Sequence, residues 1–283
     1  MPEQSKCVPG TQGHDVYFGD LMLAKTFHDP KTGDAVADPI GMWASEKLDG
    51  YRCLWTGARF QTRSGKPIHA PISFMNLMPP SVALDGELYL GRGTFESLGF
   101  IRRKTPDPEL WSRLKFHVFD IPSMMSAPFE KRMKRLGIVV RNRCIQCTFN
   151  KKECPLVFVR QILVESEKQL YDFMDTIINA RGEGVMLRAA GSVYQPKRTS
   201  TLLKIKAEFD AECVIVGHKP GKGKYKGQLG SYKCEFLDGT GPFFVAGITD
   251  EMRADPLTVG RIITIRYNGL TVKGLPRHPR FVR

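Results

Sequence analysis

The stretch SEKLDGYRCLW, residues 45–55, places a lysine two residues before an Asp-Gly turn in a pattern typical of a β-hairpin. Lys47 precedes Asp49 and Gly50, and Arg52 follows on the strand that leaves the turn. Like charge from surrounding Arg and Lys side chains would disfavour the ammonium form of Lys47 and raise its nucleophilic fraction. We therefore expect attack on an electrophile, and a phosphate ester would use the same cations and a metal ion to stabilise its transition state. A solvated lysine on a strand edge is the alternative.

Other charged residues recur at the ends of predicted strands, in the segments LDGELYL, RGEGVMLR and LLKIK. Asp85 and Glu87 alternate along one strand, and Lys204 and Lys206 along another, so each pair shares a face of its strand. Glu183 stands just before a further apolar run. A solvated strand face would explain each pair taken singly, but short matches in a fixed order rarely arise together by accident.

Composition and charge narrow the class of protein that could use these residues. The chain has 283 residues, 42% of them hydrophobic and 25% charged, which is ordinary for a globular protein. Its net charge of +13 indicates a polyanionic partner, with nucleic acid as the leading candidate. Residues 213–283 alone carry 12 Lys and Arg against 5 Asp and Glu, so the basic character is concentrated at the C-terminal end.

The N-terminal residues and the cysteine count indicate the cellular compartment in which the protein is expected. Residues 1–15 show no apolar core of a secretory signal, and no later stretch is long and apolar enough to span a bilayer. The sequence therefore predicts a cytoplasmic protein, in a bacterial cell or a virus-infected host cell, without a membrane partner. Seven cysteines, an odd number, favour reduced thiols over a disulfide framework.

Strand patterns dominate the first two thirds of the chain. Residues 42–68 are predicted to form short strands separated by turns at Asp-Gly, Thr-Gly and Ser-Gly. Further strands are predicted in residues 81–92, 114–122 and 157–164. A helix is predicted in residues 165–182, with Ser166 available at its start and Gly182 at its end, and a shorter, more basic helix in residues 128–141. Because strands and helices do not alternate regularly, an α+β fold with antiparallel sheets is favoured over a parallel sheet.

After residue 212 the sequence pattern changes to short predicted strands separated by glycines. These strands are predicted in residues 213–218, 230–237, 242–248, 261–267 and 270–276. This pattern is typical of a small β-barrel of about five strands. We expect a polar N-terminal extension in residues 1–20, a first domain in residues 21–208 and an all-β domain in residues 209–283.

The motifs together resemble the covalent nucleotidyltransferase superfamily of ATP-dependent DNA ligases, RNA ligases and capping enzymes. KLDG, DGE, FHVFDI, EGVMLR and KIK occur in the family order. More narrowly, WASEKLDGYR, LDGELYLGRGTFE, GKGKYKGQLGSYKCEF, RYNGLTVKGLPR and the closing FVR look like the minimal two-domain bacterial and phage DNA ligases, over residues 21–283. The resemblance implies an adenylation domain followed by an OB-fold. Some bacterial relatives carry an export signal, which is not visible here.

The resemblance also implies an activity. Lys47 would attack the α-phosphate of ATP to form lysyl-AMP, and the AMP would pass to the 5′-phosphate at a nick in duplex DNA. The adjacent 3′-OH would then displace it and seal the strand, in replication, repair or recombination. The protein would act mainly by positioning groups and neutralising charge, with Mg²⁺, or Mn²⁺ as a substitute, and would be a monomer.

Individual roles follow from the family motifs. Asp49 and Arg52 would hold the ribose and the reacting 3′-OH, and Lys204 and Lys206 would contact the α-phosphate and the departing pyrophosphate. Glu87 would accept a hydrogen bond from the ribose. The implied catalytic residues are Lys47, Asp49, Arg52, Lys204 and Lys206, and the implied cofactor-binding residues are Glu46, Lys47, Arg52, Arg63, Glu87, Phe119, Glu183, Arg198, Lys204 and Lys206.

Two of these roles depend on ring and carboxylate chemistry. Phe119 would stack on adenine, although a plain core aromatic is the alternative. Glu183, with Glu87, would hold the divalent metal, since Mg²⁺ prefers carboxylate and phosphate oxygens. Arg63 and Arg198 match family arginines near the nick 5′-phosphate and the AMP phosphate, for which a guanidinium fork is suited.

The C-terminal end departs from the larger ligases, whose last motif has an Arg-Asp-Lys cluster. Arg280 and Arg283 are the candidates here for orienting pyrophosphate. The glycine-rich segment 218–230 carries Tyr225 among lysines and suits a phosphate backbone, although a solvated hairpin tip is the alternative. The implied DNA-binding residues are Arg63, Lys66, Lys222, Lys224, Lys226 and Arg280.

Alternatives stay open beside this reading. Cys144, Cys147 and Cys154 in CIQCTFNKKEC could begin a zinc site, although a fourth ligand is not evident. An RNA ligase or a GTP-using capping enzyme would charge the same lysine, but the Arg after KLDG, LYLGRGTFE and GLPR favour a DNA ligase. A catalytically silent OB-type DNA-binding protein would not need the intact motif set. Viral or bacterial origin and the preference among nicks, cohesive and blunt ends are not determined by the sequence.

Overall fold

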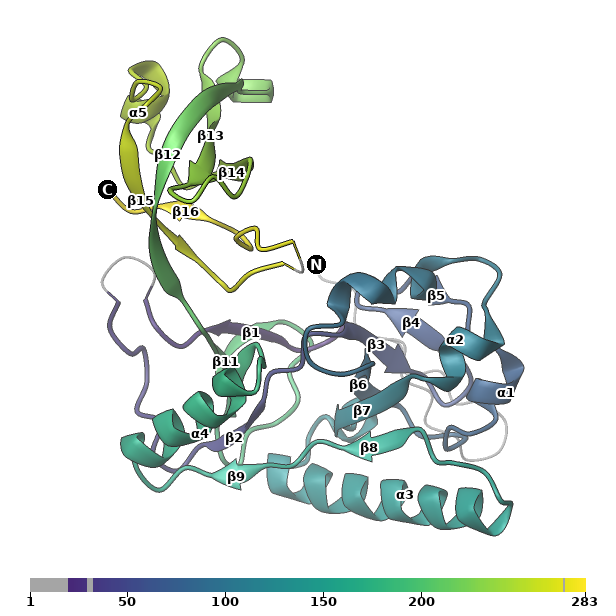
Figure 1. Cartoon of the computed structure of the whole chain (residues 1–283). Helices are drawn as coiled ribbons and strands as arrows, with labels where there is room; N and C mark the ends of the chain where they lie inside the picture. Colours follow the sequence, from purple (N-terminus) through teal and green to yellow (C-terminus); the bar gives the residue numbers. More distant parts are fainter. Residues whose placement is uncertain (1–19, 30–32, 272) are drawn as a thin grey trace. The chain divides into compact units, whose positions relative to one another are not determined.

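The computed structural model describes residues 20–29, 33–271 and 273–283, so the N-terminal extension predicted for residues 1–20 lies almost wholly outside the described residues. The chain divides into two compact units, Met1–Ile205 and Lys206–Arg283 (Figure 1). No helix within the described part of the chain is long and apolar enough to cross a membrane.

The first sheet of unit 1 forms around the hairpin that carries Arg52. Its strand order is β5 (Pro67–Ile68), β4 (Phe60–Thr62), β3 (Tyr51–Trp55), β6 (Leu84–Tyr89), β7 (Lys115–Asp120) and β8 (Leu156–Phe158). Neighbouring strands are antiparallel from β5 to β7, and β8 runs parallel to β7. One face carries the apolar core, which includes Phe60, Trp111 and Phe116.

Helices cover the core face of this sheet. Phe74 of α1 (Ile72–Met75), Trp111 of α2 (Pro108–Ser112), and Leu136 of α3 (Phe129–Phe149) join the same core. The 3-10 helix η1 (Phe95–Arg102) adds further apolar side chains to it, and η2 (Pro122–Met124) precedes α3. In Figure 1, α3 lies alongside β8, which it contacts.

The second sheet of unit 1 carries Lys47 at its margin. Its strand order is β1 (Leu23–Thr26), β11 (Arg198–Lys206), β10 (Gly184–Arg188), β2 (Trp43–Glu46) and β9 (Ile162–Leu163). Helix α4 (Glu167–Asn179) packs on this sheet through Leu170 and Ile177. The predicted helix is confirmed, and Ser166 caps it by accepting a hydrogen bond from the Gln169 amide.

Two predictions for unit 1 are wrong in detail. The basic helix α3 is not shorter than α4: it has 21 residues against 13. Its buried face continues past the predicted end at residue 141 to Cys147. Residues 157–164 do not form one strand, because β8 pairs with β7 and β9 pairs with β2, so the chain crosses between sheets at this point.

The described part of unit 2 forms an antiparallel sheet in the order β14 (Phe243–Val245), β13 (Leu229–Phe236), β12 (Phe209–Pro220), β15 (Ile262–Tyr267) and β16 (Arg280–Phe281). A bridge between Ala246 and Arg280 links the two ends of the sheet, so the strands close into the predicted barrel. The short elements η3 (Gly223–Tyr225) and α5 (Asp250–Ala254) lie between strands.

The last predicted strand is misplaced. Within residues 270–276, Leu270 and Pro276 form only an isolated bridge, and Val272 lies outside the described residues. Gly274 adopts a positive φ of 75°, which turns the chain instead of extending it. The final strand position is taken by β16, which the sequence did not predict.

Candidate functional site

Lys47 lies at the end of β2, directly beside the start of β10. Its backbone amide donates a hydrogen bond of 2.8 Å to the carbonyl of Gly184. Its Nζ forms an ion pair with the carboxylate of Glu183, and both side chains are largely buried, 21% and 12% exposed. The expectation that Lys47 is surrounded by like charge is therefore wrong for its closest charged partner. Because an ammonium nitrogen has no lone pair, Nζ must lose a proton before it can act as a nucleophile.

The glycines that follow the motif aspartates are required by close backbone approach. A Cβ on Gly50 would lie 2.5 Å from the carbonyl oxygen of Leu88, and one on Gly86 would lie 2.6 Å from that of His117. Both distances are shorter than any side chain tolerates, so only glycine fits. These two glycines let β3, β6 and β7 lie close together beneath the site.

Arg52 is fixed by the buried carboxylate of Asp85. Its Nε and one terminal nitrogen donate to the two oxygens of Asp85 at 3.0 and 2.7 Å, and the same terminal nitrogen donates to the Met22 carbonyl at 2.8 Å. The Tyr194 hydroxyl, also buried, donates to Asp85 at 2.9 Å. Asp85 therefore serves Arg52 as an anchor, a partnership that the motif spacing alone did not indicate.

Glu87 lies opposite Arg52 across the β3–β6 pair. Burial raises its pKa to about 8, while the charges of Arg52 and Lys47 lower it and those of Glu183 and Asp85 raise it further. These mutual influences place Glu87 in the same electrostatic neighbourhood as Lys47 and Glu183. Two carboxylates at that spot are chemically suited to a magnesium ion, which usually takes one or two carboxylates and completes its shell with phosphate and water.

Phe119 lies on the site side of β7, not in the core. Along β7 the core-facing Phe116 and Val118 are buried, whereas His117 and Phe119 are only partly buried. The pairing of β6 with β7 shifts by one residue between Asp85 and Gly86, which leaves Phe119 as the extra residue of a β-bulge. A bulge changes the direction in which a side chain points. The guanidinium of Arg52 lies over the Phe119 ring, 5.4 Å from its centre.

A second ion pair lies next to Lys47. Glu46 accepts two hydrogen bonds from Arg92, at 2.8 and 2.9 Å. Tyr89 and His117 stand beside it, with ring centres 5.1 Å apart. Burial, followed by the charge of Glu46, raises the pKa of Tyr89 to about 12, and burial lowers the pKa of His117 to about 4. The sequence missed Arg92, Tyr89 and His117, although the last two alternate with Glu87 and Phe119 at strand period.

The remaining predicted residues lie on β11, whose last residue Lys206 begins unit 2, or in turns of unit 1. Lys204 and Lys206 alternate with the buried Leu203 and Ile205, so they share a face of β11 as expected. Arg198 donates to the Ala24 carbonyl. Asp49 lies half-buried in the turn between β2 and β3, and Arg63 and Lys66 lie exposed between β4 and β5.

In unit 2, the predicted DNA-binding loop is an ordered structure. The Tyr225 ring lies between Lys224 and Arg253, whose cationic groups are 4.5 and 4.1 Å from its centre. Arg253 also donates to the carbonyls of Leu229 and Gly230 at 2.7 and 2.9 Å. Lys222, Lys224 and Lys226 are exposed around this support, which is compatible both with phosphate contacts and with the alternative of a solvated hairpin tip.

Arg280, predicted to contact pyrophosphate or DNA, forms an ion pair with Glu208. The carbonyl of Arg283 accepts a hydrogen bond from Thr264 at 2.8 Å, which fastens the last residue to β15. Nothing in these contacts tests the roles predicted for the two arginines. A phosphate ligand of Arg280 would have to compete with the carboxylate of Glu208.

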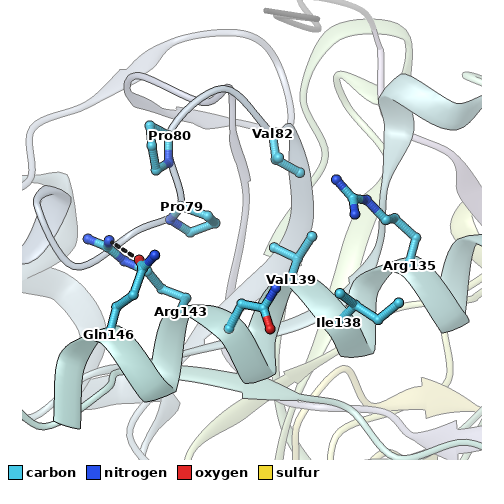
Figure 2. A pocket seen from close by; sticks show the side chains of 9 residues that line it. Pro79, Pro80, Val82, Arg135, Ile138, Val139, Arg143 and Gln146 are labelled. Atoms are coloured by element: carbon cyan, nitrogen blue, oxygen red, sulfur yellow. Dashed lines mark hydrogen bonds between the residues drawn. The ribbon is translucent and has the colours of Figure 1, made fainter. Parts of the chain in front are cut away.

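Two other features lie apart from Lys47. The described residues hold no group of three or more His, Cys, Asp or Glu that could bind a metal ion, so a zinc site at Cys144, Cys147 and Cys154 gains no support. A groove of about 180 Å³ lies where α3 meets the Pro79–Pro80 turn (Figure 2). There Arg143 binds the Leu77 carbonyl at 3.0 Å and bonds Gln146, so the groove is a seam between α3 and a loop.

Comparison with known proteins agrees with this arrangement. Residues 21–206 match the ATP dependent DNA ligase domain, and residues 220–283 match the DNA ligase OB-like domain. The DNA ligase of Haemophilus influenzae is 33% identical over 266 residues, covering 93% of this chain and 91% of that protein. A DNA ligase of Methanothrix thermoacetophila is 30% identical over 182 residues, and the chain spans only 30% of its length.

Solved structures give the same result. The structure described as "DNA binding with a minimal scaffold: Structure-function analysis of Lig E DNA ligases" superimposes with a TM-score of 0.82 at 30% identity, covering 93% of this chain and 98% of the other. The Chlorella virus DNA ligase-adenylate superimposes with a TM-score of 0.55 at 20% identity, covering 94% of this chain and 98% of the other. The second likeness shows a shared fold.

Proposed function

The chain belongs to the ATP-dependent DNA ligases, and we propose that its residues 21–208 activate the nucleotide while its residues 209–283 hold the DNA. The enzyme seals breaks between a 3′-OH and a 5′-phosphate in duplex DNA through a lysyl-AMP intermediate and an adenylated 5′ end. Minimal ligases of this type have an adenylation domain and an OB-like domain, which is the organisation found here.

We assign the nucleophile to Lys47, supported chiefly by its buried position against Glu183. Its Nζ forms a bond to the α-phosphorus of ATP while the bond to pyrophosphate breaks. The proton on Nζ has to leave first, and the Glu183 carboxylate, which accepts a hydrogen bond from that ammonium, is placed to receive it. The AMP then moves to the DNA 5′-phosphate, and the 3′-OH displaces it.

The residues around Lys47 are proposed to position the nucleotide. Arg52 is held rigidly by Asp85 and can direct its guanidinium to the ribose and the phosphate without reorganisation. Phe119, half-exposed on the same face, offers its ring to adenine. Glu87 accepts a hydrogen bond from the ribose through a carboxyl oxygen, which its ionised and neutral forms both offer.

Magnesium is the divalent ion that we propose, with manganese as a substitute. Glu183 and Glu87 would hold it, since they are the carboxylates that surround Lys47. When bound, the ion neutralises charge on the phosphate oxygens. Sealing should therefore stop on chelation with EDTA and return on addition of excess magnesium or manganese.

We propose that nicked duplex DNA lies against the loop of Lys222, Lys224 and Lys226, with Arg63, Lys66 and Arg280 as further phosphate contacts. The exposed lysines around Tyr225 support this assignment. A monomer in the cytoplasm is the expected form, and sedimentation equilibrium would test the monomer directly.

The nucleophile assignment is tested with a singly nicked fluorescent duplex, ATP and magnesium. We expect Lys47→Ala to abolish sealing while salt-sensitive DNA binding is retained, because the lysine supplies chemistry and not affinity. Lys168→Ala is the matched control, since this exposed lysine forms an ion pair with Asp172 on the surface of α4. Retained sealing in Lys47→Ala would overturn the assignment, and protein label transferred from GTP would favour a capping enzyme.

A further inference from the structure

Three cysteines gather where the end of α3 meets the segment before β8. Cys144 and Cys147 lie in the last turns of α3, and Cys154 lies just before β8. The Sγ atoms of Cys144 and Cys154 are 2.6 Å apart, and the Cys147 thiol also hydrogen-bonds Cys154. None of the three is part of the nucleotide site proposed around Lys47.

Exposure separates this cluster from the other described cysteines. Cys144 and Cys154 are partly exposed, whereas Cys147 is 2% exposed. Cys213 and Cys234 form a second neighbouring thiol pair inside the barrel of unit 2, where both are 0% exposed. Among the cysteines that the structure describes, Cys144 and Cys154 are therefore the adjacent pair that a dissolved reagent can reach.

The chain between the two residues is suited to a covalent link. Lys151 adopts a positive φ of 56° in the turn after α3, and its amide donates to the Thr148 carbonyl at 2.9 Å. This turn returns the chain so that Cys154 lies against α3, with both thiols directed to the Leu156 carbonyl. Forming a disulfide needs only a small approach of two sulfur atoms that are already in contact.

We propose that Cys144 and Cys154 are a redox-sensitive thiol pair that a small-molecule disulfide oxidises to an intramolecular disulfide. One cysteine thiolate attacks a sulfur of the reagent and expels one reagent thiolate, which gives a mixed disulfide. The second cysteine thiolate attacks the protein sulfur of that bond and expels the other reagent thiolate. The protein loses two hydrogens, and the reagent disulfide is reduced to two thiols.

The bridge would tie the last turns of α3 to β8, the edge strand beside β7. The disulfide would therefore hold the end of α3, the helix that covers one side of the unit 1 core, at a position separate from Lys47. This inference does not depend on the proposed function, because it concerns sulfur atoms that the ligase mechanism does not use.

The test uses the full chain, first reduced and then incubated with oxidised glutathione at pH 8. Free thiols are alkylated with iodoacetamide in denaturant, and intact mass and peptide mapping locate any bridge. We expect two fewer alkylated cysteines than in the reduced protein and one cross-linked peptide joining Cys144 to Cys154. Alkylation of all seven cysteines, or a bridge between any other pair, would overturn the proposal.

Variants identify the partners independently of folding and activity. Cys154→Ser should show no cross-linked peptide after oxidation, and Cys144 should be either alkylated or left as a mixed disulfide with one glutathione, because the thiol that resolves this intermediate is gone. Cys234→Ser is the matched control from the buried pair, and Cys147→Ser tests the third thiol, so both should keep the bridge. A bridge that persists in Cys154→Ser, or disappears in Cys147→Ser or Cys234→Ser, contradicts the pairing.

Discussion

The two units hold arginine–aspartate pairs of nearly identical geometry in very different surroundings. Arg52 binds Asp85 at 3.0 and 2.7 Å in unit 1, and Arg266 binds Asp210 at 2.7 and 2.9 Å in unit 2. The side chains of the first pair are 23% and 1% exposed, and those of the second are 43% and 47% exposed. Water, not bond length, therefore distinguishes the two pairs.

This difference in solvent exposure corresponds to the function proposed for each unit, catalysis in unit 1 and DNA binding in unit 2. A buried ion pair cannot relax into water, so Arg52 is held in one orientation, as catalysis by fixed charges requires. Exposed pairs and lysines are screened by salt and can rearrange, which suits a surface that meets a phosphate backbone. On this proposal, the site around Lys47 uses buried, fixed charges for chemistry, and the barrel surface uses exposed charges to bind DNA.

Among the variants that compare the two units, the largest expected effect comes from removing the buried anchor of Arg52. Asp85→Asn leaves the Arg52 charge without its counterion, and breaking a pair of this kind costs about 3 kcal/mol or more in the free energy of unfolding. We also expect nick sealing to fall at least about 100-fold, because an enzyme group that loses its orientation by about 1 Å loses that much. Calorimetry and a sealing assay measure the two effects.

Asp210→Asn is the matched control in the exposed pair. It should change the free energy of unfolding by less than about 1 kcal/mol and leave sealing of the nick nearly unchanged. Equal losses in Asp85→Asn and Asp210→Asn would show that burial does not separate the two units.

A smaller effect is expected from the lysines of the barrel loop. Replacing Lys222, Lys224 and Lys226 together by alanine should weaken duplex binding and flatten the plot of log affinity against log salt by about 0.9 per lost phosphate contact. Fluorescence anisotropy over a salt series measures the slope. Lys168→Ala should leave it unchanged, and an unchanged slope in the triple variant would remove this loop from the DNA surface.

The smallest effect concerns pH. Burial lowers the pKa of His117 to about 4, below its ordinary 6.5, near Glu46, Lys115 and the ring of Tyr89. Between those values the unfolded chain binds the proton and the folded chain does not, so stability is full above pH 6.5 and falls as pH falls. We expect a loss of up to about 2 kcal/mol from pH 7 to pH 5. His117→Gln should lose less over the same interval, and identical losses would contradict a partly buried, neutral His117.

Sequence patterns predicted those elements whose formation depends on residues close together in the chain. The amphipathic stripe and Ser166 located α4, and the glycine-punctuated strands indicated the barrel of unit 2. The motif order also indicated the family, because the same residues recur at the same strand ends. Cys147 continues the buried face of α3 beyond residue 141, where the predicted helix ended too early.

The parts that failed depend on contacts distant in sequence. Nothing local links Tyr194 to Asp85, which lies more than a hundred residues away and meets it only once both sheets of unit 1 have formed. The same holds for Arg92, which reaches Glu46 from the segment after β6. Lys47 was expected among cations because Arg52 and the two motif lysines Lys204 and Lys206 were assigned to the same site, whereas the fold places Glu183 against it.

The most direct test of the central claim is the intact mass of the purified protein after incubation with ATP and magnesium. We expect a single added AMP, removed by excess pyrophosphate and mapped by peptide sequencing to Lys47, with no adduct in Lys47→Ala. An adduct on another residue, or no adduct at any magnesium or manganese concentration, would contradict the account.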